Sequence, residues 1–181
     1  DTDSLTGSGT ITPAALTISI KDAPTKVYDG EKSLSNAYNT KDNLALWGVL
    51  GDDDVNLVVN SAEYQDANAA TDKEYRYGIT IDNLDYQLTQ GENKHAITVS
   101  DNGQTGELKA YDGTITPRKL TASVIRDMVK VYDGTNAGKQ DAIKNIVLSK
   151  DYLDKDKDSL GLTANAVYDG SNAADNRKVT Y

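Results

Sequence analysis

The chain repeats itself at an offset of 104 residues, and this repeat constrains the fold more than any other feature. Of the 20 positions in residues 11–30, 11 are identical in residues 115–134. Both stretches begin with Ile-Thr-Pro and end with Lys-Val-Tyr-Asp-Gly. Further along, Tyr64 corresponds to Tyr168 at the same offset. A period of this length predicts tandem copies of one structural unit.

The repeat places a first unit at residues 11–114 and a second at residues 115–181. Residues 1–10 resemble the end of such a unit, so we expect them to be a closing strand or linker of a preceding unit. The second copy spans only 67 residues and is expected to be C-terminally incomplete, without counterparts of residues 78–114. We expect the chain to continue. The alternatives are a shorter second unit, or a strand that fills the gap, such as residues 5–12 of a neighbouring molecule.

Charge and composition exclude several classes of function. The 19 Lys and Arg residues against 28 Asp and Glu residues give a net charge of −9, which argues against nucleic acid as a partner. No apolar run approaches the roughly 20 residues that span a bilayer, so we expect no membrane insertion by this segment. The absence of Cys removes disulfides, thiol catalysis and thiolate metal sites. The single histidine, His95, excludes a multi-histidine metal site.

Alternation of apolar and polar residues with period two predicts half-buried β-strands. Asp101-Asn102-Gly103 supplies residues that favour the tight turn of a hairpin. In the second copy, Ile143 and Val147 show helical spacing, which predicts one short helix per unit. The residues expected to line the first core are Leu16, Ile18, Ile20, Val27, Val55, Leu57, Ile79, Ile81 and Leu88.

These patterns predict a mainly β fold of two tandem units, each of about 104 residues, arranged end to end as an elongated chain. We expect the joint near residues 112–118, where Pro117 fixes its own φ and favours extended backbone before it. Short strands with frequent turn signals favour an immunoglobulin-like sandwich in each unit. A β-grasp-like sheet is the alternative.

Taken together, the motifs of the first unit resemble those of YDG domains, to which the mostly β MBG domains are related. The resemblance implies a non-catalytic stalk or spacer repeat of a large bacterial adhesin, either secreted or on the cell surface. It implies neighbouring repeats of the same chain as partners. The alternative is an adhesin module for cell adhesion that binds a glycan or a host protein. The strings that carry the resemblance are residues 11–13, 27–30, 51–55, 68–70, 85–88 and 114–117, with Tyr64.

The Tyr-Asp-Gly string is expected to be structural in both copies. Glycine adopts positive φ readily, aspartate bonds to nearby backbone, and tyrosine covers the edge of a core. A sugar-binding site is the alternative, because tyrosine stacks on glycan faces and aspartate bonds to hydroxyl groups. Presence in both copies favours the structural role. The residues of this turn motif are Tyr28, Asp29, Gly30, Tyr132, Asp133 and Gly134.

Two unique residues receive structural interpretations. Trp47 has apolar neighbours in the sequence and is interpreted as a core anchor. His95 is interpreted as an exposed strand residue without an assignable acid–base partner. The 28 carboxylates are too many for a catalytic pair to be singled out. We therefore expect no catalytic residues and no enzyme activity, and a hydrolase appended to a stalk is the weakest hypothesis.

Asp154, Asp156 and Asp158 form a weak calcium candidate, because they have the D-x-D-x-D spacing of a calcium loop. Ser159 stands where such a loop has glycine, and Asn165 stands where it has glutamate. A solvated acidic loop without a cofactor is the favoured interpretation. If calcium binds there, thermal melting of the chain should shift upward by several degrees in millimolar calcium. Identical melting curves with and without calcium would exclude the site.

Overall fold

The computed structural model describes residues 6–90, 95–139 and 141–181. The chain divides into a first unit that ends at Pro117 and a second that runs from Arg118 to Tyr181. Both units consist of strands, turns and short 3-10 helices, so the prediction of a mainly β fold is confirmed. Among the described residues, no helix is both long enough and apolar enough to cross a membrane.

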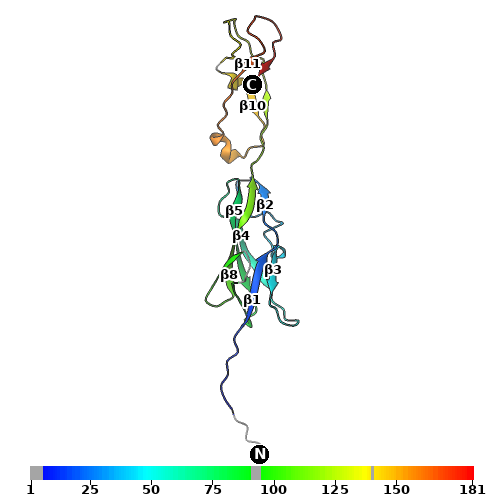
Figure 1. Ribbon diagram of the computed structural model, residues 1–181, viewed down its shortest axis with the longest axis vertical. Coiled ribbons are helices and arrows are strands. Elements are labelled where there is room, and N and C mark those ends of the chain that lie inside the picture. The colour runs from blue at the N-terminus through cyan, green and yellow to red at the C-terminus, as the bar shows by residue number, and fades with distance from the viewer. Residues whose placement is uncertain (1–5, 91–94, 140) are drawn as a thin grey trace, which may run out of the picture. The chain divides into compact units, whose positions relative to one another are not determined.

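The described residues of the first unit form two sheets (Figure 1). In the smaller sheet, β1 lies between β3 and β6, antiparallel to β3 and parallel to β6. In the larger sheet the order is β2-β8-β5-β4, and β7 also pairs with β8. The strands of this unit are β1 (Ala14–Ile20), β2 (Thr25–Val27), β3 (Leu44–Trp47), β4 (Leu57–Tyr64), β5 (Ala70–Ile81), β6 (Tyr86–Leu88), β7 (Ala96–Val99) and β8 (Thr105–Thr116).

β8 holds the larger sheet together. Along one edge it pairs antiparallel with β5. Along the other edge, its first half pairs with β7 and its last three residues pair in parallel with β2. The turn between β7 and β8 contains Gly103 at φ 70°, as the Asp101-Asn102-Gly103 string predicts. Three other strands therefore depend directly on β8.

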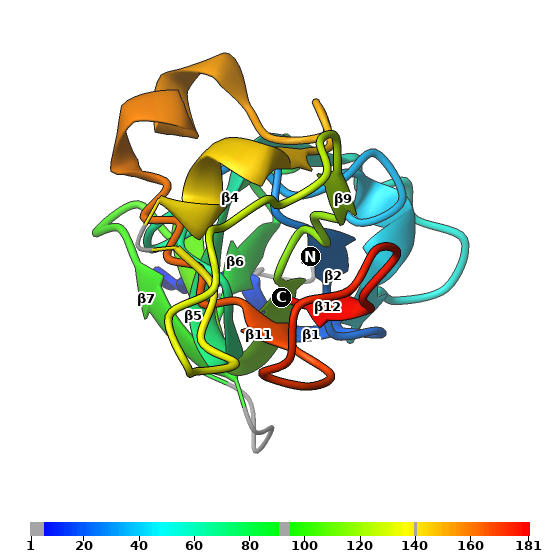
Figure 2. The ribbon, with the colours of Figure 1, turned by 90° about the horizontal axis from the view of Figure 1, so that it is seen from above.

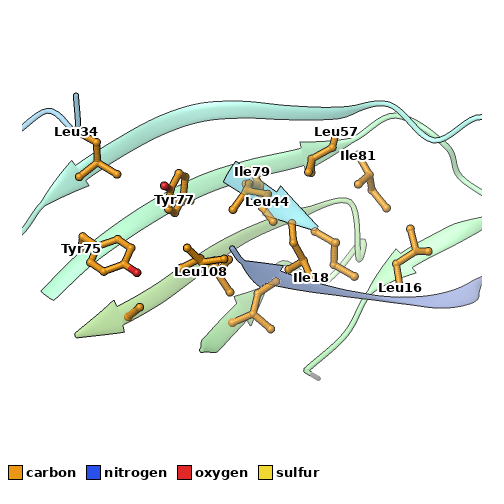
Figure 3. Packing of buried hydrophobic residues seen from close by; sticks show 14 of the residues in the cluster. Leu16, Ile18, Leu34, Leu44, Leu57, Tyr75, Tyr77, Ile79, Ile81 and Leu108 are labelled. Carbon is orange, nitrogen blue, oxygen red and sulfur yellow. The ribbon is translucent and has the colours of Figure 1, made fainter. Parts of the chain in front are cut away.

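A single core lies between the two sheets of the first unit (Figure 3). Alternate residues of β5 point into it, and four of them, Tyr75, Tyr77, Ile79 and Ile81, are at most 2% exposed. Two sheets that share one core agree with the favoured sandwich. A β-grasp fold would have a helix packed on its sheet. The only helix in the described part of this unit is the three-residue 3-10 helix η1 (Lys41–Asn43).

Most of the predicted core residues are buried, and one prediction is wrong. Val27 is 57% exposed, because β2 turns its other face, which carries Lys26, toward the interior. Val55 is partly buried and packs against the core from outside a strand. The seven predicted residues that are buried are Leu16, Ile18, Ile20, Leu57, Ile79, Ile81 and Leu88.

The second unit repeats the local pairings of the first. Tyr168 pairs with Val179 as Tyr64 pairs with Tyr75, and β11 and β12 lie side by side in Figure 2. The predicted helix is wrong in type: Ile143 lies in a 3-10 helix, and the residues that follow form a strand. The elements of this unit are β9 (Ala122–Val124), η2 (Ala142–Asn145), β10 (Ile146–Leu148), η3 (Asp154–Ser159), β11 (Val167–Tyr168) and β12 (Val179–Thr180).

The shared core predicts a large difference between two substitutions in the larger sheet. Ile79→Ala removes a side chain that is 0% exposed and should lower the free energy of unfolding by about 2–5 kcal/mol. Val58→Ala, at a side chain that is 41% exposed, should cost less than about 1 kcal/mol. Urea unfolding followed by the fluorescence of Trp47, the only tryptophan, reports on the first unit. Equal losses in the two variants would contradict the assignment of the core.

Candidate functional site

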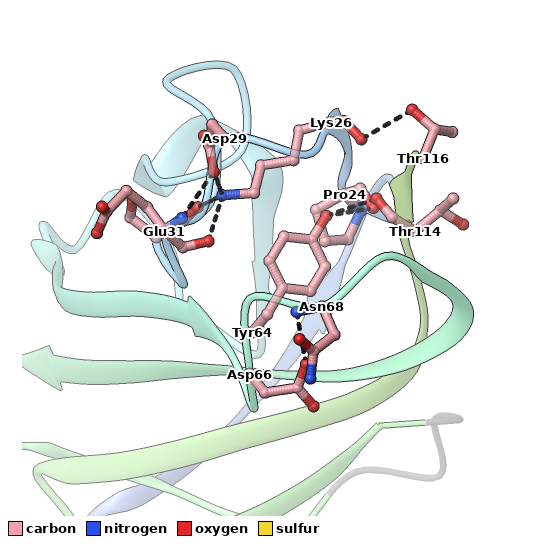
Figure 4. A network of polar contacts seen from close by, with 10 residues as sticks. Pro24, Lys26, Asp29, Glu31, Tyr64, Asp66, Asn68, Thr114 and Thr116 are labelled. Carbon is pink, nitrogen blue, oxygen red and sulfur yellow. Dashed lines mark hydrogen bonds and ion pairs between the residues drawn. The ribbon is translucent and has the colours of Figure 1, made fainter. Parts of the chain in front are cut away.

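The Lys-Val-Tyr-Asp-Gly string forms a turn around the ammonium group of Lys26 (Figure 4). The Lys26 side chain is only 6% exposed. Its Nζ donates to Asp29 Oδ1 at 2.8 Å, to the Glu31 carbonyl at 2.7 Å and to the Ser33 carbonyl at 2.9 Å. It also lies 5.7 Å from the centre of the Tyr64 ring. The ammonium thus has three acceptors and one aromatic face, which together compensate for the loss of water.

Asp29 and Gly30 give the turn its backbone shape. Asp29 Oδ1 accepts the N–H of Glu31 at 2.9 Å, and Gly30 adopts φ 77°. A side-chain acceptor two residues before the donor, followed by a residue with positive φ, is the turn chemistry expected of Asp-Gly. Burial alone would raise the pKa of Asp29, but hydrogen bonds from Lys26 and Glu31 outweigh it, so the pKa is below its usual value.

Tyr64 connects this turn to the sheet. Its ring is 1% exposed, and its hydroxyl lies 2.8 Å from the Pro24 carbonyl and 3.1 Å from the Thr114 carbonyl (Figure 4). Burial raises the pKa of Tyr64 to about 12. The hydroxyl therefore stays protonated and donates, joining β4 to the segment before β2 and to the end of β8.

The second copy has the same turn with the same bonds. Lys130 Nζ donates to Asp133 Oδ1 at 2.7 Å and lies 5.7 Å from the centre of the Tyr168 ring. The Tyr168 hydroxyl donates to the Met128 carbonyl at 2.8 Å, as Tyr64 does to Pro24. Gly134 has φ 80°. Hydrogen bonds from Lys130 and Thr135 lower the pKa of Asp133 to about 2. We call this arrangement, in both copies, the lysine-centred turn.

The geometry of the lysine-centred turn favours the structural role predicted for the Tyr-Asp-Gly string. Asp29 Oδ1 already accepts two hydrogen bonds within the turn, and the N–H of Tyr28 donates to Thr116 of β8 at 2.9 Å. The roles of the lysine and of its tyrosine platform were not predicted from the sequence, although Lys26 and Tyr64 both recur at the 104-residue offset.

A second pair of polar partners also went unnoticed in the sequence. Asn43 is 4% exposed, and its Nδ2 donates to the Tyr77 hydroxyl at 2.9 Å. In the second copy, Asn145 donates to the Tyr181 hydroxyl at 3.2 Å. The tyrosines match at an offset of 104, but the asparagines match at 102, because the second copy is two residues shorter before this point. The shortened offset hides the pair from a simple comparison.

The calcium candidate residues are not brought together. Asp154, Asp156 and Asp158 lie in the 3-10 helix η3, where three residues complete a turn, so side chains two and four positions apart point in different directions. Across the described residues, no three His, Cys, Asp or Glu side chains gather as a metal site would require. The arrangement is that of a solvated acidic segment, and calcium binding stays a prediction.

Two interpretations of unique residues need correction. Trp47 is 61% exposed and is not a core anchor, because the alternation of β3 points Leu44 inward and Trp47 to the other face. His95 is half-buried and precedes β7 rather than lying exposed within a strand. Its Nδ1 accepts the backbone N–H of Ile20 at 3.4 Å.

The bonds of the lysine-centred turn predict that Lys26 stabilises the first unit. Lys26→Met keeps most of the apolar stem but removes the charge and all three donated hydrogen bonds, and should destabilise the first unit by about 1–3 kcal/mol. Lys32→Met, at an exposed neighbour, is the matched control and should change stability by less than about 0.5 kcal/mol. Urea unfolding followed by Trp47 fluorescence compares the two. A Lys26→Met variant as stable as the control would show that the turn forms without its lysine.

Comparison with known proteins finds a similarity within the first unit. A search of curated proteins and a search of solved structures each found no match. A family model, that of the YDG domain, matches residues 12–94. The matched residues include β1 to β6, the lysine-centred turn and Tyr64. Residues 12–94, within the first unit, are therefore similar to the YDG domain.

Proposed function

We propose that the chain is a non-catalytic spacer from the stalk of a bacterial adhesin, on the cell surface or secreted, with neighbouring repeats as its partners. One observation carries the proposal: both copies form the lysine-centred turn with the same bonds. The most specific motif of the sequence thus serves the fold of each unit. A residue set that recurs for a structural reason is what a spacer requires, whereas a binding site requires groups that remain available to a ligand.

Charge and composition suit this role. A net charge of −9 favours solubility and discourages association through nonspecific contacts. The chain has no Cys, so its folding requires no oxidising machinery. Buried tyrosine hydroxyls, such as those of Tyr64 and Tyr77, supply cross-links by hydrogen bonds instead.

One observation favours the alternative, a module that binds a glycan or a host protein. Trp47 and Leu50 are 61% and 62% exposed, and both lie at the end of β3 and in the loop after it. An exposed indole is a good platform for the apolar face of a sugar. Ser149 occupies the position of Trp47 in the second copy, so this feature does not recur.

A screen of the 181-residue chain against glycan and mucin arrays separates the two functions. The spacer proposal expects no reproducible binding at micromolar concentrations. Reproducible binding at those concentrations would overturn it in favour of the binding module. Trp47→Ala then locates the site: loss of binding would assign it to the exposed indole. Val58→Ala, at another exposed apolar residue, serves as the control.

A further inference from the structure

Each copy of the Tyr-Asp-Gly string contains an Asp-Gly bond, which is chemically fragile. In any protein, the backbone nitrogen that follows an aspartate can attack the side-chain carbon of the protonated carboxyl group. The attack is fastest before glycine, because glycine has no Cβ to obstruct its own nitrogen. Asp29 precedes Gly30 in the first copy, and Asp133 precedes Gly134 in the second. The repeated turn therefore carries a latent site of self-modification in each unit.

This reaction exchanges atoms only with water. A bond forms between the glycine nitrogen and the aspartate Cγ, the bond from Cγ to the protonated oxygen breaks, and that oxygen leaves as water with the N–H proton. The resulting succinimide ring then takes up one water molecule. Where water opens the ring at the backbone carbonyl, the product is isoaspartate, whose main chain is one carbon longer. Such a product at Asp29 would displace the carboxylate that accepts the hydrogen bonds of the turn.

The turn requires both residues of the fragile bond. Gly30 and Gly134 have φ of 77° and 80°, a conformation that glycine adopts without strain. A Cβ on Gly134 would meet no atom within 4 Å, so the backbone conformation and not crowding requires glycine there. The aspartate is required because its Oδ1 accepts the backbone N–H two residues later, at 2.9 Å in both copies.

That same hydrogen bond keeps the reacting atoms close together. The small ring that it closes contains both the Cγ of Asp29 and the nitrogen of Gly30. The side chains of Asp29 and Asp133 are 48% and 54% exposed, so water has access to them. Burial therefore does not protect the two Asp-Gly bonds. Protection has to come from the charge state of the carboxyl group.

The lysine of the turn controls this charge state. Nζ lies 2.8 Å from Oδ1 in the pair Lys26–Asp29 and 2.7 Å in the pair Lys130–Asp133. The two lysine side chains are only 6% and 14% exposed, and an opposite charge this close favours the ionised carboxylate, which a backbone nitrogen does not attack. Hydrogen bonds from Lys130 and Thr135 lower the pKa of Asp133 from 3.8 to about 2, which reduces its protonated fraction at neutral pH by more than about tenfold.

We propose that the lysine of each turn protects its Asp-Gly bond from isomerisation by keeping the carboxylate ionised and bound (Figure 4). This chemical function adds to the stabilising role of the lysine. It accounts for the recurrence, in both copies, of a lysine three residues before the aspartate of an Asp-Gly pair. The proposal does not depend on the spacer function, because it rests only on the geometry of the turn.

Two variants of the full chain test the proposal, and each contains its own control in the other copy. Lys130→Met should raise the rate of isoaspartate formation at Asp133 by about tenfold or more and leave the rate at Asp29 unchanged. Lys26→Met should raise the rate at Asp29 severalfold and leave the rate at Asp133 unchanged. The folded chains are incubated for several weeks at neutral pH, and peptide mapping with electron-transfer fragmentation then quantifies isoaspartate at each site.

An unchanged rate at the aspartate beside the substituted lysine would overturn the proposal. A lower rate there would overturn it as well, because it would show that the ammonium stabilises the charge that develops during the attack. In chains unfolded by urea, the native chain and both variants should isomerise at equal rates, since the turn is absent. Unequal rates in urea would show that the lysine acts through the local sequence and not through the folded turn.

A third variant separates protection from loss of stability. Ile79→Ala keeps Lys26 in place and is expected to destabilise the first unit at least as much as Lys26→Met does. The folded state still predominates in such a variant, so isoaspartate formation at Asp29 should stay within about twofold of the native rate. If Ile79→Ala raises the rate at Asp29 as much as Lys26→Met does, the reaction proceeds from the unfolded chain and the proposal is wrong.

Discussion

Backbone pairing by β8 is the constraint on which the first unit depends. This strand pairs with β5 along one edge and with β7 and β2 along the other. All of these pairings join segments distant in sequence except the hairpin with β7, so they are costly in chain entropy before the core forms. The closing strand also covers Tyr64, whose ring lies beneath the ammonium of the lysine-centred turn. The turn, the sheet and the core thus share the same strand.

Tyrosine takes the place that phenylalanine has in many cores, since the chain has 11 Tyr and no Phe. The hydroxyl group of a buried tyrosine requires a hydrogen-bond partner. Three buried tyrosines of the first unit have such a partner. The Tyr75 hydroxyl donates to Asp112 at 2.8 Å, and the Tyr77 hydroxyl donates to the Tyr38 carbonyl at 2.6 Å. The Tyr86 hydroxyl donates to Asp53 at 2.5 Å. The bonds of Tyr77 and Tyr86 attach loops to the sheets, whereas the bond of Tyr75 joins β5 to β8. The core therefore specifies the conformation of these loops as well as the strands.

Period-two alternation was enough to predict the buried faces of the long strands, as Ile79 and Ile81 show. It failed at Val27, because a three-residue strand is too short for its own pattern to show which face is inside. At Trp47, apolar neighbours were misleading, although the alternation of β3 points the indole outward. The role of Lys26 could not be derived from periodicity, since it depends on a ring 38 positions away in the chain. Such long-range polar contacts are specified by the fold and not by the local sequence.

The parallel pairing of β2 with β8 has a mechanical consequence. The chain enters β2 from the N-terminal side and leaves β8 at Thr116, immediately before Pro117. Tension between these two points pulls the paired strands along their axes in opposite directions. The hydrogen bonds of Thr114 with Pro24 and of Tyr28 with Thr116 then carry the load together, in shear. Antiparallel strands pulled from adjacent ends would instead separate one bond at a time. Under tension between these two points, the strand pair that completes the fold would also bear the load.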